Sequence, residues 1–413
     1  MISKSAFVIM LLLTVFCASG YPAGFLVYNQ DATSVAMGNA FTAIADNPSA
    51  VFYNPAGMNQ LEGTQIRSGF QVIVPDTSFK GADSGHTTDM HDKISIPVTG
   101  FITHKVNDKI SIGGGIFTPF GLVTEWPSRW EGDGVSTYSA LRTFFVNPAV
   151  SIQVHPRLSL AAGIDYVYSD FKIRRSINLD QITGIPIGLA LGKITLDGSD
   201  DSWGYNLGML FHINDTWTLG LAYRSKVNLE FDGHAQYRMR PLLRGLFPPT
   251  DISPRIELPP LVSGQIAARF GGKWTVATGF LWTGWSVYDE LTPKFRNDFL
   301  IPPSMKSSPQ DWKDVTTFLL GVEYDLNQTW VLRGGYIFDQ TPVPERTLSP
   351  MVPDSDSHLF SAGIGYEHDN ISVDMASMLM FFKDRHTRRN IDGLNGEYTS
   401  TTVTFLASLT YRF

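Results

Sequence analysis

Arginines and apolar residues lie close together in one long segment of the chain, residues 235–257. The cations are Arg238, Arg240 and Arg244, and the apolar side chains among them are Met239, Leu242, Leu243, Leu246 and Phe247. An exposed apolar segment of this kind marks a binding surface, because it leaves apolar area in water unless something covers it. The segment therefore predicts a surface for an apolar molecule, with guanidinium groups beside it for an anionic partner.

Residue types that carry catalysis are present, but they form no known motif. The sequence contains no Gly-x-x-x-x-Gly-Lys-Ser/Thr loop, no His-Glu-x-x-His, no Gly-x-Ser-x-Gly and no calcium loop of EF-hand spacing. Ser136, Ser139 and His155 offer no recognisable triad. His86 and His91 share a loop with aspartates, and we interpret them as solvated side chains. We therefore expect neither an enzyme, nor a metal site, nor a cofactor.

The first residues have the plan of a secretory signal peptide. Lys4 is the only charge among residues 1–20, an apolar run covers 6–18, and small residues follow at 18–20. The run is too short for a membrane-spanning helix, which needs about 20 apolar residues. We predict a signal peptide over 1–20, with 23 as the latest cleavage site. The only cysteine is Cys17, so the mature chain would contain no disulfide.

The rest of the chain has the composition and periodicity of a β-protein. It is 43% hydrophobic and 17% charged, and no stretch of 18 apolar residues follows residue 24. From Trp217 to Phe231, residues of mostly apolar type alternate with polar, charged or small ones. A period-two segment of this length predicts a barrel strand between lipid and a polar lumen rather than a strand of a secreted soluble protein, where about 5 to 6 residues are usual. The net charge of -7 does not support a nucleic-acid partner.

Candidate strands follow one another through this part of the chain. They cover 64–74, 93–105, 109–119, 141–154, 157–175, 201–213, 216–233, 258–270, 273–288, 311–325, 329–339, 357–368, 371–387 and 398–413. Short turns alternate with long loops between them, as in barrels whose turns lie at the periplasm. Only closure satisfies every backbone group in lipid. We therefore predict an all-β fold, a 14-stranded antiparallel transmembrane β-barrel over 64–413, whose aromatic end, Phe413, is presented to the barrel-assembly machinery.

A barrel of this width encloses a lumen that other residues must fill. Residues 21–63 show little strand pattern, so they are the candidates for this role. Within them, Asn47 and Asn54 each precede a proline. This predicts two short helical turns, each with an asparagine cap and a proline at its first position. We predict that 21–63 fold back as a helical hatch inside the lumen. A periplasmic cap, or a plug that only stabilises the lumen, is the alternative.

The third candidate strand contains residues that weaken a strand. Gly113, Gly114 and Gly115 follow one another, and Pro119 lacks a backbone N–H for the sheet. We therefore expect an interruption of pairing within 110–121, which lipid tolerates only where the gap faces protein or a cavity. The alternative is that these small residues only make room for the hatch.

The order and spacing of several motifs resemble the FadL-type long-chain fatty acid transporters of the outer membrane, along the whole chain. The motifs are AGF (23–25), NPA (54–56), FGLVTEW (120–126), WGYNLGMLF (203–211), LAYRSKVNLEFDG (221–233), FDQTPVP (338–344) and YRF (411–413). The resemblance implies a 14-stranded barrel in the Gram-negative outer membrane. Its hatch would carry the motif Asn54, Pro55 and Ala56.

The resemblance also implies passive uptake of long-chain fatty acids, with aromatic or other hydrophobic hydrocarbons as the alternative substrates. Two outer loops would form a first hydrophobic groove, here 235–257 together with Phe120, Leu122, Trp126 and Trp130. A pocket against the hatch, near Phe25, would then hold the ligand. Arg175 and Lys306 match basic positions of the family. Alternatively, Arg175 or Lys306 is a solvated loop charge, and Arg238, Arg240 and Arg244 pair with lipopolysaccharide.

In this family a kink of the third strand opens a side window. The resemblance therefore implies that Gly113, Gly114, Gly115 and Pro119 form a lateral gate into the membrane. It implies a monomer surrounded by outer-membrane lipid and lipopolysaccharide. A barrel enzyme such as a lipase and a non-transporting adhesin or structural barrel are the alternatives from other functional classes.

Overall fold

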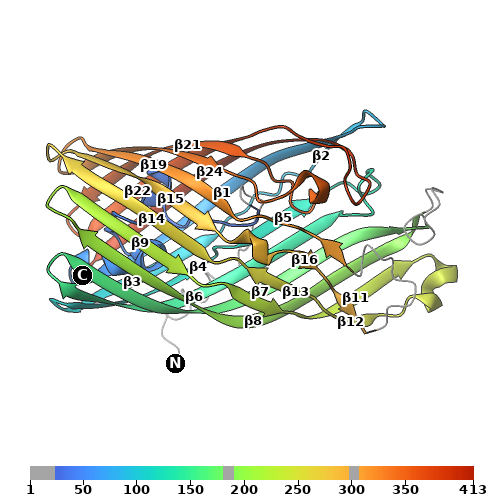
Figure 1. The fold of residues 1–413 in the computed structure, drawn as a ribbon, viewed down its shortest axis with the longest axis horizontal. Helices are drawn as coiled ribbons and strands as arrows, with labels where there is room; N and C mark the ends of the chain where they lie inside the picture. Colours follow the sequence, from blue (N-terminus) through green and yellow to red (C-terminus); the bar gives the residue numbers. More distant parts are fainter. Residues whose placement is uncertain (1–23, 180–189, 297–306) are drawn as a thin grey trace, which may run out of the picture.

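Alternation of apolar and polar residues produces long antiparallel strands that close into a barrel (Figure 1). The computed structural model describes residues 24–179, 190–296 and 307–413. Within these residues, 14 strands form the wall, and the last pairs with the first. The wall strands are β1 (Thr64–Gly81), β3 (Val98–Asn107), β4 (Ile110–Phe117), β6 (Tyr138–His155), β7 (Leu158–Asn178), β8 (Ala190–His212), β9 (Trp217–Arg224), β14 (Leu261–Phe270), β15 (Trp274–Thr283), β19 (Val315–Asp325), β20 (Trp330–Asp339), β21 (Ser357–His368), β22 (Ile371–Phe382) and β24 (Gly396–Arg412).

Shorter elements extend the wall or lie at its openings. The short strands are β2 (Thr87–Asp89), β5 (Gly121–Glu125), β10 (Val227–Glu230), β11 (Asp232–Met239), β12 (Thr250–Ser253), β13 (Arg255–Leu258), β16 (Glu290–Leu291), β17 (Lys294–Phe295), β18 (Ser308–Pro309) and β23 (Arg385–Thr387). The helical segments are α2 (Ala32–Ala36), α3 (Ala50–Tyr53), η1 (Pro55–Gln60), η2 (Pro241–Leu246), η3 (Trp285–Val287) and η4 (Glu345–Thr347).

The predicted 14-stranded antiparallel barrel is confirmed, and each candidate segment overlaps one wall strand. The boundaries differ most toward the long loops. The candidate at 273–288 ends as a strand at Thr283, and the candidate at 311–325 begins only at Val315. β7 reaches 21 residues, close to its expected span, whereas β8 reaches 23 residues and begins well before the expected residue 201.

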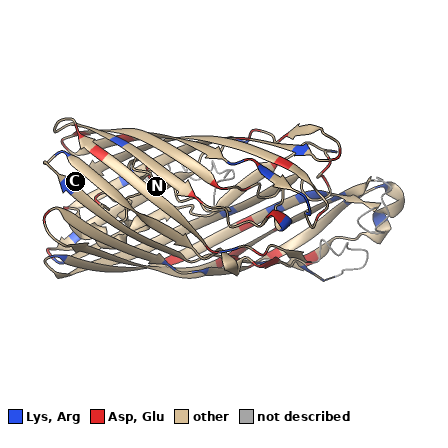
Figure 2. Ribbon diagram, turned by 45° about the horizontal axis from the view of Figure 1, so that its top comes forward, with Lys and Arg blue, Asp and Glu red and all other residues tan. Residues whose placement is uncertain are grey.

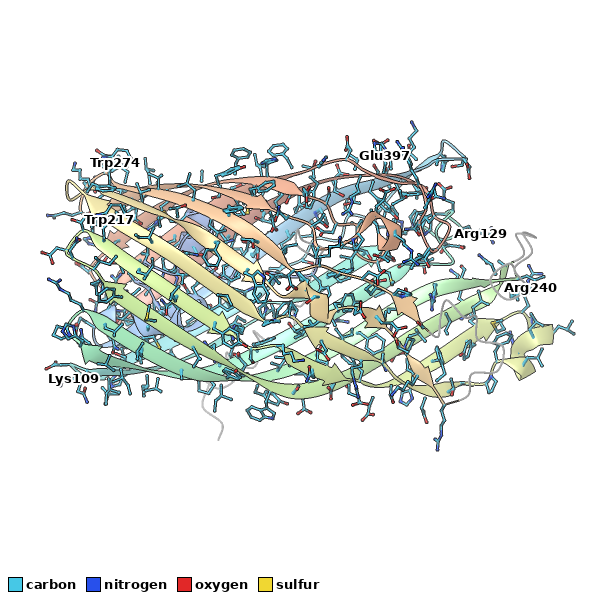
Figure 3. All side chains as sticks on the ribbon, viewed as in Figure 1. Lys109, Arg129, Trp217, Arg240, Trp274 and Glu397 are labelled. Atoms are coloured by element: carbon cyan, nitrogen blue, oxygen red, sulfur yellow. The ribbon has the colours of Figure 1, made fainter. Side chains whose placement is uncertain are left out.

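The two ends of the barrel differ (Figure 3). Lys109, Trp217 and Trp274 lie at the end with the short turns, whereas Arg129 and Arg240 lie at the end with the long loops. Many charged residues also gather toward the long-loop end (Figure 2). This asymmetry is typical of outer-membrane barrels, whose short turns face the periplasm. The exposed apolar side chains between the ends include Ile112, Leu160, Ile164, Leu207, Leu320, Leu379 and Phe405.

The described residues contain no helix that is both long enough and apolar enough to span a membrane.

The candidate strand at 216–233 is divided between β9, β10 and β11, which corrects the prediction of one continuous barrel strand. Trp217 and Leu221 are exposed on the outer surface, but Leu229 and Phe231, beyond the end of β9, are fully buried inside. A break between β9 and β10 therefore moves the following side chains to the opposite face. Where the wall contacts lipid, apolar side chains are stable on its outer face. Beyond the lipid the outer face contacts water, so apolar side chains are stabilised by facing inward.

Residues 24–63, the described part of the predicted hatch, lie inside the barrel, and we call them the hatch segment (Figure 1). Asp31 caps α2 by accepting the backbone N–H of Thr33 at 3.0 Å. Asn54 caps η1 by accepting the N–H of Ala56 at 3.2 Å, with Pro55 at the first helical turn, as the sequence predicts. Asn47 instead accepts the N–H of Ser49 in the turn before α3. Local capping thus fixes short helical turns that are too short to be stable alone.

A buried charge network joins this segment to the wall. Arg67 of β1 pairs with Asp31 and, at 2.9 Å, with Asp374 of β22. Arg333 of β20 pairs with Asp374 at 2.8 Å and with Glu323 of β19 at 2.7 Å. Separating such groups would leave buried charges without partners, at high cost. The network therefore fixes the chain at Asp31. We expect the displacement of residues that precede Asp31 to cost less free energy than the displacement of the helical turns that follow it.

Candidate functional site

The wall is interrupted beside its third strand, β4. Pairing between β3 and β4 ends at Gly100 and Ile116, and the next backbone hydrogen bond between the two segments joins His91 N to Glu125 O at 2.8 Å. Between these two points the segment before β3 bonds to β1, from Gln71 N to Pro97 O at 2.9 Å and from Ile73 N to Ser95 O at 3.0 Å. We call this interruption the wall gap. The isoleucines exposed at its rim are Ile94, Ile96 and Ile116, which places the gap at an apolar outer surface.

The chain that leaves the wall at this point pairs with the hatch segment. Leu26 and Phe120 form an antiparallel bridge. Two backbone hydrogen bonds flank it, from Val27 N to Pro119 O at 2.7 Å and from Gly121 N to Phe25 O at 2.9 Å. The side chain of Gln30 also donates to Thr118 O at 3.0 Å. The backbone groups released by the interruption are thus satisfied by the first residues of the hatch segment.

The three glycines lie before the gap, within regular pairing. Gly113, Gly114 and Gly115 of β4 pair with both β3 and β6. The interruption expected within 110–121 therefore lies after the glycines: pairing with β6 continues to Phe117, and the chain departs at Thr118. A glycine weakens a strand only slightly, whereas the missing N–H of Pro119 cannot be replaced.

Replacing Gly113 by alanine is expected to destabilise the barrel by about 1 to 3 kcal/mol, because the added methyl group overpacks the lumen. A Cβ there would lie 2.5 Å from Met58 Sδ of the hatch and 2.9 Å from the Ile102 carbonyl oxygen. Gly114→Ala is the matched control, since its nearest neighbour would be 3.8 Å away. The midpoint of thermal unfolding, followed by electrophoretic mobility, measures the difference. Equal midpoints for the two variants would contradict this role of Gly113.

The NPA motif fastens the hatch segment to the wall. The Asn54 side chain donates to Thr42 O at 2.8 Å and to Met209 O of β8 at 3.0 Å. Ser151 of β6 donates to Ala56 O at 3.2 Å. The motif therefore holds η1 against three neighbouring wall strands, β6, β7 and β8.

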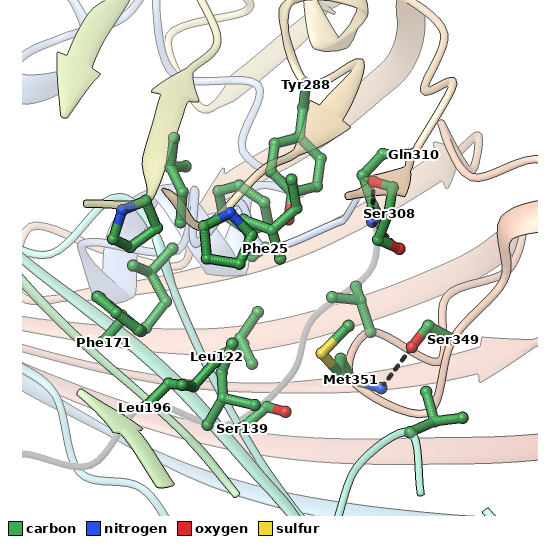
Figure 4. A pocket seen from close by; sticks show the side chains of 18 of the residues that line it. Phe25, Leu122, Ser139, Phe171, Leu196, Tyr288, Ser308, Gln310, Ser349 and Met351 are labelled. Atoms are coloured by element: carbon green, nitrogen blue, oxygen red, sulfur yellow. Dashed lines mark hydrogen bonds between the residues drawn. The ribbon is translucent and has the colours of Figure 1, made fainter. Parts of the chain in front are cut away.

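A cavity of about 1120 Å³, including space open to the solvent, lies where the hatch segment, the wall and the outer loops meet (Figure 4). We call it the central cavity. Its apolar lining includes Phe25, Leu122, Leu141, Phe171, Leu196, Tyr288, Trp312 and Met351, and its polar lining includes Ser139, Arg175, Ser308, Gln310, Ser349 and Asp392. A mostly apolar space with a few polar groups is typical of a small-molecule site.

Aromatic rings enclose Phe25, the residue that the hatch segment contributes to the central cavity. The ring centroid of Phe25 lies 4.6 Å from Trp285, 5.5 Å from Tyr288 and 5.6 Å from Trp312. Phe120 packs behind it at 6.3 Å and is not part of the lining. Phe25 and Leu122 are thus two of the predicted site residues that the structure brings together at this cavity.

Arg175 places a partly buried cation in the wall of this mostly apolar space. Its Nε atom has no hydrogen-bond partner, and Arg175 forms no ion pair with any described residue. On the outer face of β7, exposed Tyr168 is followed by Asp170 and Arg174, so this level lies above the apolar band. Burial lowers the pKa of Arg175 to about 10, and the negative charge of Asp392 opposes that shift. The guanidinium group therefore remains charged at neutral pH.

Trp126 and Trp130, predicted for an outer groove, are buried packing residues. Their rings stack at 4.5 Å with an interplanar angle of 12°. Trp126 Nε1 donates to Pro350 O and Trp130 Nε1 to Ser136 O, both at 2.9 Å. The two indoles join loops at the outer end of the barrel, and neither lines the central cavity.

The apolar residues of 235–257 divide into an exposed and a buried set. Leu242 and Leu246 of η2 are 95% and 50% exposed. Leu243 is partly buried against the core, and Phe247 is buried with its ring 5.7 Å from Tyr237. The exposed set gives the outer end an apolar tip. Lys306 lies outside the described residues.

Several residues that line the central cavity or pack directly behind its lining carry no signal in the sequence. Asp392 lies in an ordinary polar loop, and nothing in its neighbourhood marks it as a partner of Arg175. Trp285, Tyr288 and Trp312 lie within segments predicted as strands, where aromatic residues are common. Their convergence on Phe25 depends on the ends of β15 and β19, which no local pattern defines.

Comparison with known proteins agrees with this geometry. The family model described as outer membrane protein transport protein (OMPP1/FadL/TodX) matches residues 13–413. The long-chain fatty acid transport protein of Escherichia coli O6:H1 is 25% identical over 395 residues, which cover 87% of this chain and 87% of that protein.

Two solved structures share the fold. A Pseudomonas aeruginosa FadL homologue aligns with a TM-score of 0.85 and 22% identity, over 95% of this chain and 100% of that chain. The Pseudomonas putida toluene transporter TodX aligns with a TM-score of 0.75 and 18% identity, over 96% of this chain and 99% of that chain. Because the family model matches nearly the whole sequence, this chain belongs to the OMPP1/FadL/TodX family and is an outer-membrane transport protein, not an enzyme.

Proposed function

We propose that this protein takes up long-chain fatty acids passively, and that Arg175 holds the carboxylate in the central cavity. The observation that supports this is a partly buried guanidinium group that has no hydrogen-bond or ion-pair partner among the described residues and lies in a mostly apolar space. A buried charge without a partner is costly, and a carboxylate supplies paired acceptors for it. The apolar lining binds the acyl chain, with about 0.8 kcal/mol for each methylene that leaves water. The name of the Escherichia coli relative supports the same substrate class.

Aromatic hydrocarbons are the second candidate substrates. The aromatic rings around Phe25 form a surface that suits a flat apolar ligand. The structural neighbour from Pseudomonas putida is named a toluene transporter. Such a ligand has no charge for Arg175, so this candidate leaves the partly buried cation without a role.

Competition binding distinguishes the two candidates. Purified protein in mild detergent would bind a fluorescent long-chain fatty acid, with oleate or toluene as the competitor. We expect oleate to displace the probe at a far lower concentration than toluene. Strong competition by toluene with weak competition by oleate would favour hydrocarbons, and binding of neither would contradict both proposals.

Capture in this proposal begins at the exposed tip of η2. A double variant, Leu242→Ser with Leu246→Ser, is expected to lower the initial uptake rate at limiting oleate about threefold, because encounters at the tip become shorter. The affinity of the central cavity should stay unchanged. Leu326→Ser, which alters an exposed leucine in a short turn at the opposite end, is the matched control. An unchanged rate in the double variant would rule out the tip as the capture surface.

Release in this proposal proceeds through the wall gap into the membrane. A second cavity of about 400 Å³ shares Leu122, Met351 and Val352 with the central cavity, and its lining extends to Met90 beside the gap. The bridge between Leu26 and Phe120 lies at the interrupted strand. We infer that the residues before Asp31 separate from the strand at 118–121 while ligand passes, because the charge network holds the chain from Asp31 onward.

A further inference from the structure

A carboxylate shares the central cavity with the cation that we assign to the ligand. Arg175 lies near the outer end of β7, and Asp392 lies in the loop between β23 and β24. Both line the cavity, yet they form no ion pair with one another. The loop is held by hydrogen bonds from Asp392 N to Asn390 Oδ1 at 2.9 Å and from Ile391 N to Arg346 O at 3.0 Å. The two opposite charges therefore face a common space, and neither satisfies the other.

Few other groups compensate the Asp392 carboxylate. No described residue donates a hydrogen bond to its oxygens. The charged or titratable groups on the surrounding elements include Arg175 of β7, Tyr398 of β24, Glu131 and Asp133 of the loop before β6, and Glu345 and Arg346 of η4. Asp133 accepts a hydrogen bond from Ser176 Oγ at 2.9 Å, and Arg346 pairs with Asp311 at 3.5 Å. Burial raises the pKa of Asp392, and Arg175 opposes that shift. Protonation of Asp392 therefore costs less than protonation of an exposed aspartate.

An anionic ligand changes the protonation equilibrium of Asp392. A headgroup bound to Arg175 brings a second negative charge into the cavity that Asp392 lines. Two carboxylates in one partly solvated site cannot both ionise easily, so the bound anion raises the pKa of Asp392 further. Binding then takes up a proton, and the affinity rises as the pH falls from above the pKa of Asp392 in the complex. A neutral ligand produces no such effect.

We propose that Asp392 is a specificity-determining residue of the central cavity: an anionic ligand binds Arg175 together with a proton that Asp392 takes up. This inference rests on the proposed function, because it requires an anion at Arg175. Asp392 thereby favours neutral ligands when it is ionised and admits anionic ligands when it is protonated.

A ligand with a permanent charge tests the proposal, because a fatty acid would itself titrate. Hexadecane-1-sulfonate stays ionised between about pH 7.5 and pH 5, whereas the carboxyl groups of the protein titrate toward the lower value. We expect its affinity for the wild-type protein to rise about tenfold over this interval, as for a nearby like charge in a partly solvated site. Asp392→Asn should bind the sulfonate at both pH values as tightly as the wild-type protein does at the lower one.

Calorimetry in buffers of different ionisation enthalpy supplies a second readout. Sulfonate binding should take up a proton in the wild-type protein and none in Asp392→Asn. Hexadecan-1-ol, the neutral control, should bind independently of pH in both. Sulfonate binding that is independent of pH in the wild-type protein, or an unchanged pH dependence in Asp392→Asn, would overturn the role of Asp392 alone. Absence of sulfonate binding at every pH would overturn the proposed function with it.

Discussion

Replacing Arg175 by methionine is expected to lower the affinity for oleate by about 10- to 100-fold, because charge-assisted hydrogen bonds contribute about 1.5 to 3 kcal/mol. The affinity for toluene should stay unchanged, since a hydrocarbon gains nothing from the guanidinium group. Methionine keeps an unbranched side chain of similar length, so the lining of the cavity stays closed. Competition against a fluorescent fatty acid measures both affinities in one preparation.

Arg174→Met is the matched control for this variant. Arg174 adjoins Arg175 on β7, but it is exposed on the outer face with its guanidinium group 4.9 Å from the ring centroid of Tyr138. Its replacement should leave both affinities unchanged. The free energy of unfolding should not fall in Arg175→Met, because the variant removes a partly buried charge that forms no ion pair with any described residue. Equal oleate affinity in the wild-type protein and Arg175→Met would contradict carboxylate recognition by Arg175.

A disulfide between positions 26 and 120 is expected to reduce oleate uptake by about tenfold or more, because it prevents a conformational step on which passage depends. The flanking hydrogen bonds make Leu26 and Phe120 a non-hydrogen-bonded pair, whose Cα atoms lie about 4.5 Å apart. This separation is within the range of a disulfide. The double variant Leu26→Cys with Phe120→Cys would introduce two thiols into a mature chain that is predicted to contain none, so they have no competing partners.

The same preparation supplies the control for this cross-link. Reduction should restore uptake to the level of the two single variants, since only the covalent bond is removed. Oleate binding to the central cavity should persist in the oxidised protein, because the cross-link closes the exit and leaves the lining in place. Undiminished uptake with a fully formed disulfide would show that the first residues of the hatch segment stay paired with 118–121 during transport.

The strand pattern of the sequence determined the barrel, with short turns at one end and long loops at the other. Alternation along β24 puts Phe405, Leu409 and Tyr411 on the exposed outer face and Thr404 and Thr410 in the buried lumen. These features are local, because the side-chain period of a strand and the cap of a helical turn depend on residues that adjoin in sequence. The Asn-Pro step at Asn54 and Pro55 was predictable for the same reason.

The tertiary structure decided where the apolar residues of this alternating pattern face outward and where they face inward. The alternation through 217–231 continues in sequence, but the exposed face reverses between β9 and β10 because the surroundings change from lipid to water. The wall gap begins after Ile116, where the chain that leaves the wall forms hydrogen bonds with the hatch segment at Pro119 and Gly121. Likewise, Arg175 and Asp392 are far apart in sequence and meet only through closure of the barrel. Long-range register sets such contacts, and no short pattern of residues encodes it.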